Sequence, residues 1–175
     1  MVHKIKRLLT ISRPELQVQG SDQEFRALVH GMLAFAARLE AVRSGFGSII
    51  GLTGIQYTIL ISVAHLEEQG GVSVNTISAH LRVSGPFITI ETNKLLGVGL
   101  LTKRQDVKDR RRVCLRVTRK GRDLLGKLAP IQVQVNDILF GFLDATQFRQ
   151  LHGMVDEMSA CGDRAVALLD YIAMG

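Results

Sequence analysis

Apolar positions at helical spacing dominate the first half of this sequence, and polar capping residues mark where the helical segments begin. Residues 21–24 read Ser-Asp-Gln-Glu, the pattern of a capping box, and apolar residues then recur every three or four positions. This pattern predicts a first helix that runs to about Ser44 and ends at Gly45-Phe46-Gly47. A second capping box at residues 53–56 predicts a helix that stops near residues 70–71.

Two shorter helices follow, joined by a tight turn. Ser73 is placed to cap a helix of about two turns that ends at Leu81, and Ser84 is placed to cap the next helix, which ends near Leu96. Short helices joined in this way cross steeply, which is the helix-turn-helix arrangement. We therefore expect the helix from Ser84 to be the second, recognition helix of such a motif.

After these helices the pattern changes from helical spacing to alternation. Apolar and polar side chains alternate from Val113 to Thr118, which predicts a strand, and residues 100–104 are expected to pair with it in a hairpin. Thr118 is also placed to cap a long amphipathic helix that Pro130 should bend, and a capping box at residues 144–147 predicts a last helix. The predicted fold class is mainly α with a small β-hairpin wing, a winged helix-turn-helix.

The first and last helices have apolar faces with no obvious partner inside the chain. Such helices usually pack against a second copy of themselves, so we expect a homodimer built on N- and C-terminal dimerisation helices. The expected organisation is an N-terminal extension over residues 1–20, a winged helix-turn-helix domain over residues 51–121, and a helical dimerisation region made of residues 21–50 and 122–175.

Positive charge is concentrated in one segment. The net charge of the chain is +6, but residues 102–122 alone hold ten Lys and Arg against Asp106 and Asp109. The rest of the chain is therefore slightly acidic. A basic excess confined to one segment is typical of a surface that binds a polyanion, because each neutralised phosphate releases condensed counterions.

Other classes of protein are not favoured. Cys114 and Cys161 form neither a disulfide framework nor a metal-ligand pattern, which fits a reducing cytoplasm. The N-terminus has no signal-peptide pattern, and the uncharged stretch at residues 45–64 contains several polar residues and a capping signal, so we expect no membrane segment. Gly97-Val98-Gly99 follows a helix rather than a strand, so it does not predict a dinucleotide site. We expect no catalytic residues, no metal site and no cofactor.

An ordered set of residues resembles the MarR family of winged-helix regulators, over roughly residues 21–160. The set is Leu52-Thr53, Gln56, Val83-Ser84, Ile88-Thr89, Leu95, Gly99-Leu100-Leu101, Arg104, Asp109-Arg110-Arg111, Leu115-Arg116-Val117-Thr118 and Gly121. The resemblance implies a sequence-specific DNA-binding transcriptional regulator, a repressor of catabolic or stress genes that a small aromatic acid or its coenzyme A thioester relieves. In a dimer the two recognition helices would lie roughly 34 Å apart and bind a pseudo-palindromic operator in double-stranded DNA.

The resemblance also implies which residues meet DNA. It places the helix from Ser84 in the major groove, with Ser84, Gly85, Pro86, Phe87, Thr89, Ile90 and Asn93 near bases and backbone, and short polar and basic side chains such as Lys94 can reach the same atoms. In the hairpin loop, Asp109 would hold a wing arginine in place, and Arg110 and Arg111 would enter the minor groove, flanked by Lys108 and Arg112. Other basic residues would contact phosphates: Lys103, Arg104, Arg116 and Arg119.

Two positions depart from the family pattern. Glu91 and Thr92 stand where aliphatic residues facing the core are expected. Either the helix is placed one residue off in this interpretation, or Glu91 pairs with a basic neighbour, because a buried carboxylate needs a partner.

The family resemblance places an effector site between the dimer helices and the winged lobe. By position it implicates His30, Phe35, Arg38, Tyr57, Ile61 and His65. Phe35 and Tyr57 would hold an aromatic ring and Arg38 a carboxylate, although the same rings are equally suited to the core and Arg38 to the surface.

Alternatives to effector-controlled regulation stay open. One is an effector-independent architectural DNA-binding or protein-binding winged-helix module. Another is a thiol-redox sensor based on Cys114, whose basic neighbours could lower its pKa, although an inert exposed thiol is the simpler interpretation. Cys161 is expected to pack in the dimer.

Overall fold

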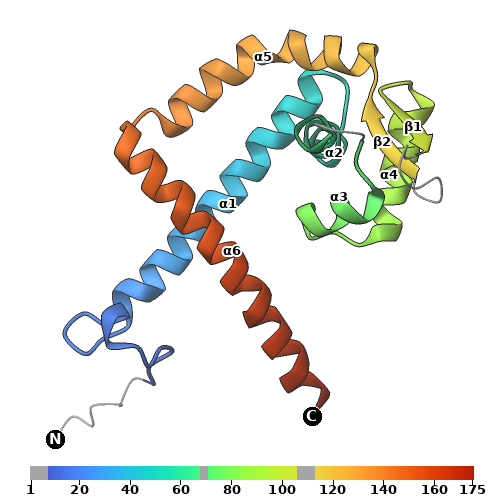
Figure 1. Cartoon of the computed structure of the whole chain (residues 1–175). Helices are drawn as coiled ribbons and strands as arrows, with labels where there is room; N and C mark the ends of the chain where they lie inside the picture. Colours follow the sequence, from blue (N-terminus) through green and yellow to red (C-terminus); the bar gives the residue numbers. More distant parts are fainter. Residues whose placement is uncertain (1–7, 68–70, 106–112) are drawn as a thin grey trace, which may run out of the picture. The chain divides into compact units, whose positions relative to one another are not determined.

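The computed structural model describes residues 8–67, 71–105 and 113–175, and it is mainly helical with one antiparallel hairpin (Figure 1). The predicted fold class is confirmed. The elements are a 3-10 helix at Pro14–Leu16, then α1 (Gln23–Ile49), α2 (Gly54–Leu66), α3 (Val74–Leu81), α4 (Gly85–Gly97), β1 (Leu101–Gln105), β2 (Val113–Val117), α5 (Arg119–Phe140) and α6 (Ala145–Met174). The chain divides into two compact units, one up to Leu128 and one from Ala129 to Gly175.

The core of the first unit lies between α2, α3, α4 and the hairpin. Its buried residues come from all four elements: Ile59, Leu60, Val63, Val72, Ile77, Ile88, Leu95, Leu100, Leu101, Leu115 and Val117. In the hairpin Leu101 pairs with Val117 and Gln105 with Val113. Val72 adds a third short strand segment, because its backbone exchanges hydrogen bonds of 3.0 and 2.8 Å with that of Leu115. This pairing joins the segment before α3 to β2.

Several predicted caps are confirmed by hydrogen bonds. Thr53 and Gln56 form the complete capping box of α2, and Asp144 with Gln147 forms that of α6. The hydroxyl of Ser73 accepts from the backbone of Thr76 at the start of α3.

The first turns of α4 and α5 differ in how they are capped. Thr118 accepts from the backbone of Gly121 at 3.1 Å and so caps α5 as predicted. Ser84 occupies the N-cap position of α4, but its side chain makes no capping hydrogen bond. α5 continues through Pro130.

The predicted limits of α1 are wrong at both ends. The capping box at its start does not form: Asp22 is the N-cap residue, and its side chain bonds other groups. The helix also runs through Gly45 and Gly47 to Ile49. Gly47 is needed here because a Cβ atom would lie 2.8 Å from the carbonyl oxygens of Leu52 and Thr53. The glycine therefore permits a close approach to the start of α2 and does not end the helix.

Asp22 ties the segment before α1 to the helix. Its Oδ2 atom accepts from the hydroxyl of Thr10 at 2.7 Å, from the backbone of Thr10 at 2.8 Å and from Nε of Arg26 at 2.9 Å. The two bonds from Thr10, with Arg26, lower the pKa of this carboxyl from 3.8 to about 2. Residues 8–22 are thus held to the first turn of α1.

The second unit consists of the end of α5 and the whole of α6. No residue of α6 is buried, and large apolar side chains along it are exposed, among them Phe148 at 57% and Leu169 at 65%. Within the described part of the chain no single helix is long and apolar enough to cross a membrane. Only α1 and α2 taken together reach that composition, and they are bent by 88°.

Candidate nucleic-acid interface

Helix α4 has one buried face and one exposed face. Ile88, Glu91, Thr92 and Leu95 are buried against the core. The exposed face carries Pro86, Phe87, Thr89, Ile90, Asn93 and Lys94. The residues of α4 that were predicted to meet DNA therefore lie together on the open side of this helix, with Ser84 exposed and Gly85 half-buried at its start.

Glu91 does face the core, so the helix was placed correctly and the pairing alternative is confirmed. Only 6% of the residue is exposed. Its carboxylate accepts from Nζ of Lys94 at 2.6 Å and from Nε2 of Gln56 at 3.0 Å. The hydrogen bond from Lys94 is the main reason that the pKa of Glu91 is lowered, and Gln56 adds to it against the opposing effect of burial. The Gln56 contact was not foreseen, because it joins residues 35 positions apart.

The buried hydroxyl group of Thr92 has its hydrogen-bond partner within α4. Its hydroxyl donates to the carbonyl oxygen of Ile88 at 2.8 Å, as threonines in helices commonly do. Both polar residues at expected aliphatic positions are therefore hydrogen-bonded, and the burial of α4 leaves neither of them unsatisfied.

The hairpin places basic side chains on both of its faces. Lys103 faces α4, where its Nζ donates to Oδ1 of Asn93 at 3.1 Å. Arg104 and Arg116 lie on the other face of the hairpin, as the register requires. There they line an open concavity of about 390 Å³ together with Thr102, Val117, Thr118, Arg119 and Arg122.

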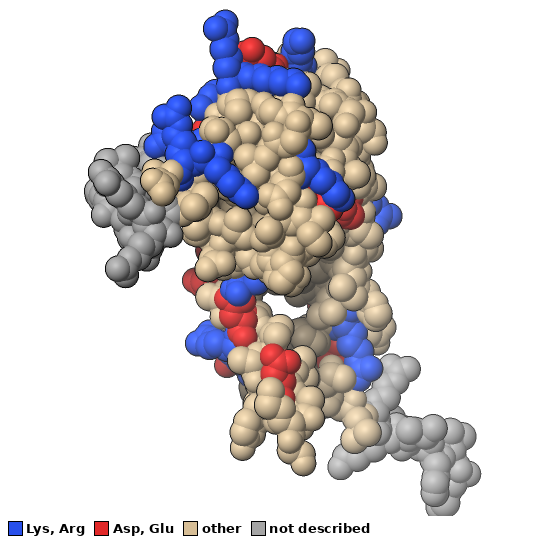
Figure 2. Space-filling view, turned by 90° about the vertical axis from the view of Figure 1, so that its right-hand side faces the viewer, with Lys and Arg blue, Asp and Glu red and all other residues tan. Residues whose placement is uncertain are grey.

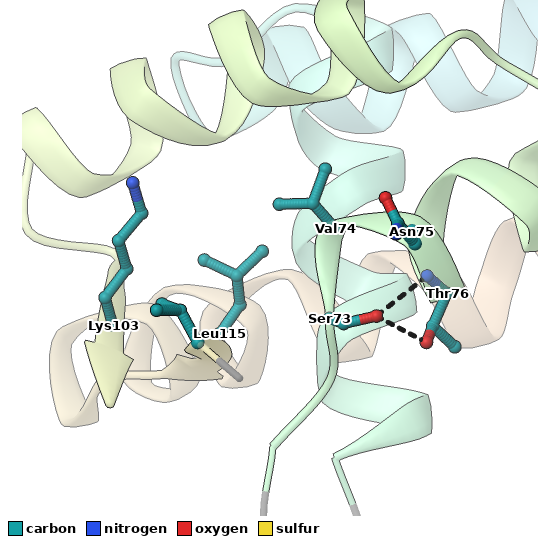
Figure 3. A pocket seen from close by; sticks show the side chains of 7 residues that line it. Ser73, Val74, Asn75, Thr76, Lys103 and Leu115 are labelled. Atoms are coloured by element: carbon teal, nitrogen blue, oxygen red, sulfur yellow. Dashed lines mark hydrogen bonds between the residues drawn. The ribbon is translucent and has the colours of Figure 1, made fainter. Parts of the chain in front are cut away.

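A second concavity lies between the start of α3 and the inner face of the hairpin. Its volume is about 680 Å³, and it is lined by Ser73, Val74, Asn75, Thr76, Lys103, Val113 and Leu115. Figure 3 shows Lys103 and Leu115 on one side of it and the first turn of α3 on the other, where the hydroxyl of Ser73 bonds Thr76. This concavity is polar at α3 and basic at Lys103.

Arg122 and Arg119 lie next to carboxylates of the same chain. Arg122 pairs with Glu67, which also accepts from the backbone of Val117 at 2.7 Å. Arg119 lies 4.0 Å from Asp123. Figure 2 shows Lys and Arg side chains gathered on the upper part of one face, with fewer acidic side chains among them. The predicted wing residues Lys108, Asp109, Arg110, Arg111 and Arg112 lie outside the described residues.

One of the two cysteines, Cys114, differs from the expectation, whereas the packing of Cys161 in a dimer stays a prediction. Cys114 is buried, with 5% exposed, so the expectation of an exposed thiol is wrong. The segment before α3 covers this side chain. Gly71 in that segment lies so close that a Cβ atom added to it would be 2.8 Å from Cβ of Cys114. Cys161 is exposed on α6, 3.1 Å from a guanidinium nitrogen of Arg164.

The predicted effector residues lie on two helices. His30, Phe35 and Arg38 are exposed on α1, and Arg38 donates to the carbonyl oxygen of Ala34 in its own helix. On α2, Tyr57 is buried and its ring meets that of Phe46 edge-on at 5.7 Å, Ile61 is half-buried and His65 is exposed. The concavities described above are lined by other residues. The effector site stays a prediction. Among the described residues, no cluster of three His, Cys, Asp or Glu is arranged to hold a metal ion.

Known proteins resemble this chain in sequence over one segment and in fold over most of its length. Residues 50–112, a span that contains α2, α3, α4 and β1, match the sequence profile of the MarR family. No curated protein matches the chain.

Solved structures share the same architecture. The transcription regulator MarR from Oenococcus oeni PSU-1 is 17% identical with a TM-score of 0.65, over 76% of this chain and 98% of that one. A MarR transcriptional regulator from Methanosarcina mazei Go1 is 21% identical with a TM-score of 0.58, over 81% and 99%. The MepR protein of S. aureus, in a complex with DNA, is 17% identical with a TM-score of 0.61, over 75% and 95%. The shared architecture shows that this chain has the winged helix-turn-helix fold, and residues 50–112 are similar in sequence to the MarR family.

Proposed function

We propose that this protein is a sequence-specific DNA-binding transcription regulator that acts as a homodimer. The observation that carries the proposal is the exposed face of α4, where Thr89, Asn93 and two apolar side chains stand clear of a fully buried opposite face. A helix held in this way fits the major groove, which admits an α-helix and displays a distinct pattern of groups for each base pair. The DNA complex of the similar MepR structure supports the same assignment.

The apolar part of this face has a specific use. Phe87 is 40% exposed and Ile90 is 55% exposed, on the same side of α4 as Asn93. Apolar side chains in the major groove recognise the methyl group of thymine. Replacing single thymines of the operator by deoxyuridine removes only that methyl group. At one position or more this should weaken binding of the native protein and have little effect on Ile90→Ala.

The homodimer is supported by exposed apolar surface on the two long terminal helices. Leu28 is 59% and Leu33 is 63% exposed on α1, and Leu151, Val155 and Leu169 are exposed on α6. A 30-residue helix with no buried residue gains little stability from tertiary packing, so its apolar face requires a partner. Sedimentation equilibrium should give twice the chain mass, and a charged replacement such as Leu151→Glu should shift the protein toward monomer, whereas exposed Arg149→Glu should not.

The regulatory part of the proposal is repression relieved by a small aromatic acid or its coenzyme A thioester. It rests on the family resemblance and on the two helices that carry Arg38 and Tyr57. Arg38 is exposed, so its guanidinium group is available to a carboxylate, which it can bind through two hydrogen bonds.

Fluorescence anisotropy with the full-length protein tests the proposal. The protein is titrated onto DNA from upstream of its own gene and onto scrambled DNA, first across salt concentrations and then with a panel of aromatic acids and their thioesters. We expect specific binding that Arg110→Ala with Arg111→Ala abolishes. A matched loss of two charges, Arg13→Ala with Lys127→Ala, should leave it nearly unchanged.

The same titration separates the second candidate function. An architectural DNA-binding module would bind the two DNAs alike, with a plain salt dependence and no response to any ligand. That result would refute the proposed regulator.

A further inference from the structure

A lysine of the wing strand holds an amide of α4 in one orientation. Nζ of Lys103 lies 3.1 Å from Oδ1 of Asn93, and both side chains are exposed. Lysine can only donate hydrogen bonds, so the amide atom that faces it is necessarily the oxygen. The amide nitrogen of Asn93 therefore points away from the lysine, with its two N–H groups available.

The contact follows from the hairpin itself. Lys103 is paired with Leu115 in the register and shares the inner face of the hairpin with Leu101. Side chains alternate along a strand, so Lys103 points toward α4 while its neighbour Arg104 points the other way. Figure 3 shows the side chain extended from β1 toward the neighbouring helix.

The charge of Lys103 is not cancelled by a carboxylate among the residues that the structure describes. The neighbouring Lys94 differs, because its ammonium is bound to Glu91 at 2.6 Å. The ammonium therefore adds positive charge beside Asn93, and this pair of side chains offers mainly donors: the two N–H groups of the amide and those of the Lys103 ammonium that remain.

This combination has a preferred base. Guanine presents two acceptors in the major groove, N7 and O6, whereas adenine presents the acceptor N7 beside the N6 amino donor. An asparagine that binds adenine through two hydrogen bonds must accept from N6 with its oxygen, which here faces an ammonium. We propose that Asn93 and Lys103 together select guanine over adenine at one symmetric position of the operator, with Lys103 as the positioning residue. This inference rests on the proposed DNA-binding function.

The experiment measures base preference by competition. Each base pair of one operator half-site is replaced in turn, and the competitors are titrated against the native protein, Asn93→Ala, Lys103→Met, Lys103→Arg and the control Lys127→Met. Lys127 is an exposed lysine of α5, so its change removes the same charge elsewhere. Thermal unfolding confirms that each variant is folded.

We expect one position at which the native protein prefers guanine to adenine by about tenfold or more, the scale of a good two-bond contact. Asn93→Ala and Lys103→Met should both reduce this preference to within about threefold, the scale of a lost contact. Lys103→Arg, which keeps the charge and the donors, should retain it, as should Lys127→Met.

Two results would overturn the inference while leaving the DNA-binding function intact. One is a native preference for adenine at the position that responds to Asn93→Ala. The other is an unchanged guanine preference in Lys103→Met. A native protein that does not distinguish its operator from scrambled DNA refutes the proposed function itself, and the inference with it.

Discussion

Gly47 provides a direct test of how α1 joins the winged-helix core. It is buried near the end of α1, and a Cβ atom would lie 2.8 Å from the carbonyl oxygens of Leu52 and Thr53. These are backbone atoms, and the Thr53 oxygen already accepts from the backbone of Tyr57 at 2.9 Å in the first turn of α2. They cannot swing aside as the end of a flexible side chain can. Gly47→Ala should therefore destabilise the protein.

The magnitude follows from two opposing contributions. Alanine is favoured over glycine inside a helix by about 0.5–1 kcal/mol, whereas forcing a methyl group into a packed site costs about 1–3 kcal/mol. Combining the two ranges, we expect a net loss of up to about 2.5 kcal/mol in the free energy of unfolding for Gly47→Ala. Gly45 is the matched control, because it lies in the same helix and its Cβ would meet nothing within 4 Å. Gly45→Ala should gain about 0.5–1 kcal/mol.

Urea unfolding followed by circular dichroism measures both variants. The protomer concentration is kept the same throughout, because the stability of a dimer depends on it. If Gly47→Ala proves as stable as Gly45→Ala, the close approach of α1 to α2 does not exist in solution and the reasoning is refuted.

Three further predictions concern Asp22, the two cysteines and Gln56. The folded pKa of Asp22 is lowered from 3.8 to about 2, so its stabilisation is present above the unfolded value and lost as the pH falls toward 2. Asp22→Asn should thus lower the free energy of unfolding at near-neutral pH but not at the acid end of that window, and an equal loss at both would contradict the assignment. A thiol reagent should modify Cys114 of a Cys161→Ser variant only after unfolding, because Cys114 is buried; a fast reaction in the folded variant would show that it is accessible. Gln56→Ala removes a donor to the buried carboxylate of Glu91 and should cost about 1–3 kcal/mol in urea unfolding; no loss would mean that this hydrogen bond is absent.

Local signals were sufficient for most of the helix limits. The caps at Thr53, Ser73 and Asp144 depend on residues within three positions of one another, so the sequence displays them directly. The strand alternation at residues 113–117 is equally local. These elements, placed in order, were enough to predict the winged helix-turn-helix.

The errors arose where distant groups decide the local structure. Gly45-Phe46-Gly47 looks like a helix end, but the role of Gly47 depends on backbone atoms of the following turn and α2 cap. Ser21 and Glu24 were expected to form a capping box, but Asp22 is the N-cap residue instead, and its carboxylate binds Thr10 and Arg26. The burial of Cys114 depends on Gly71, which is far from it in sequence. No local sequence pattern marks the contact of Asp22 with Thr10 or that of Cys114 with Gly71.

In the candidate site, too, the features set by local sequence could be predicted and those set by distant residues could not. Its exposed face could be predicted, because the spacing of Ile88 and Leu95 fixes which side of α4 is buried. The orientation of Asn93 could not, since it depends on Lys103 from the hairpin.

The side chain of Gln56 connects the start of α2 to the buried face of α4. Gln56 accepts from the backbone of Thr53 at 3.2 Å as part of the cap of α2, and at the same time it donates to Glu91 on α4. Glu91 in turn holds Lys94, on the edge of the exposed face. The first turn of α2, which follows directly on the Gly47 contact with α1, therefore cannot shift without carrying α4 along or breaking a hydrogen bond to a buried carboxylate. An aliphatic residue at position 91 would fill the same space without this constraint, so the polar pair makes the position of the recognition helix depend on the junction between α1 and α2.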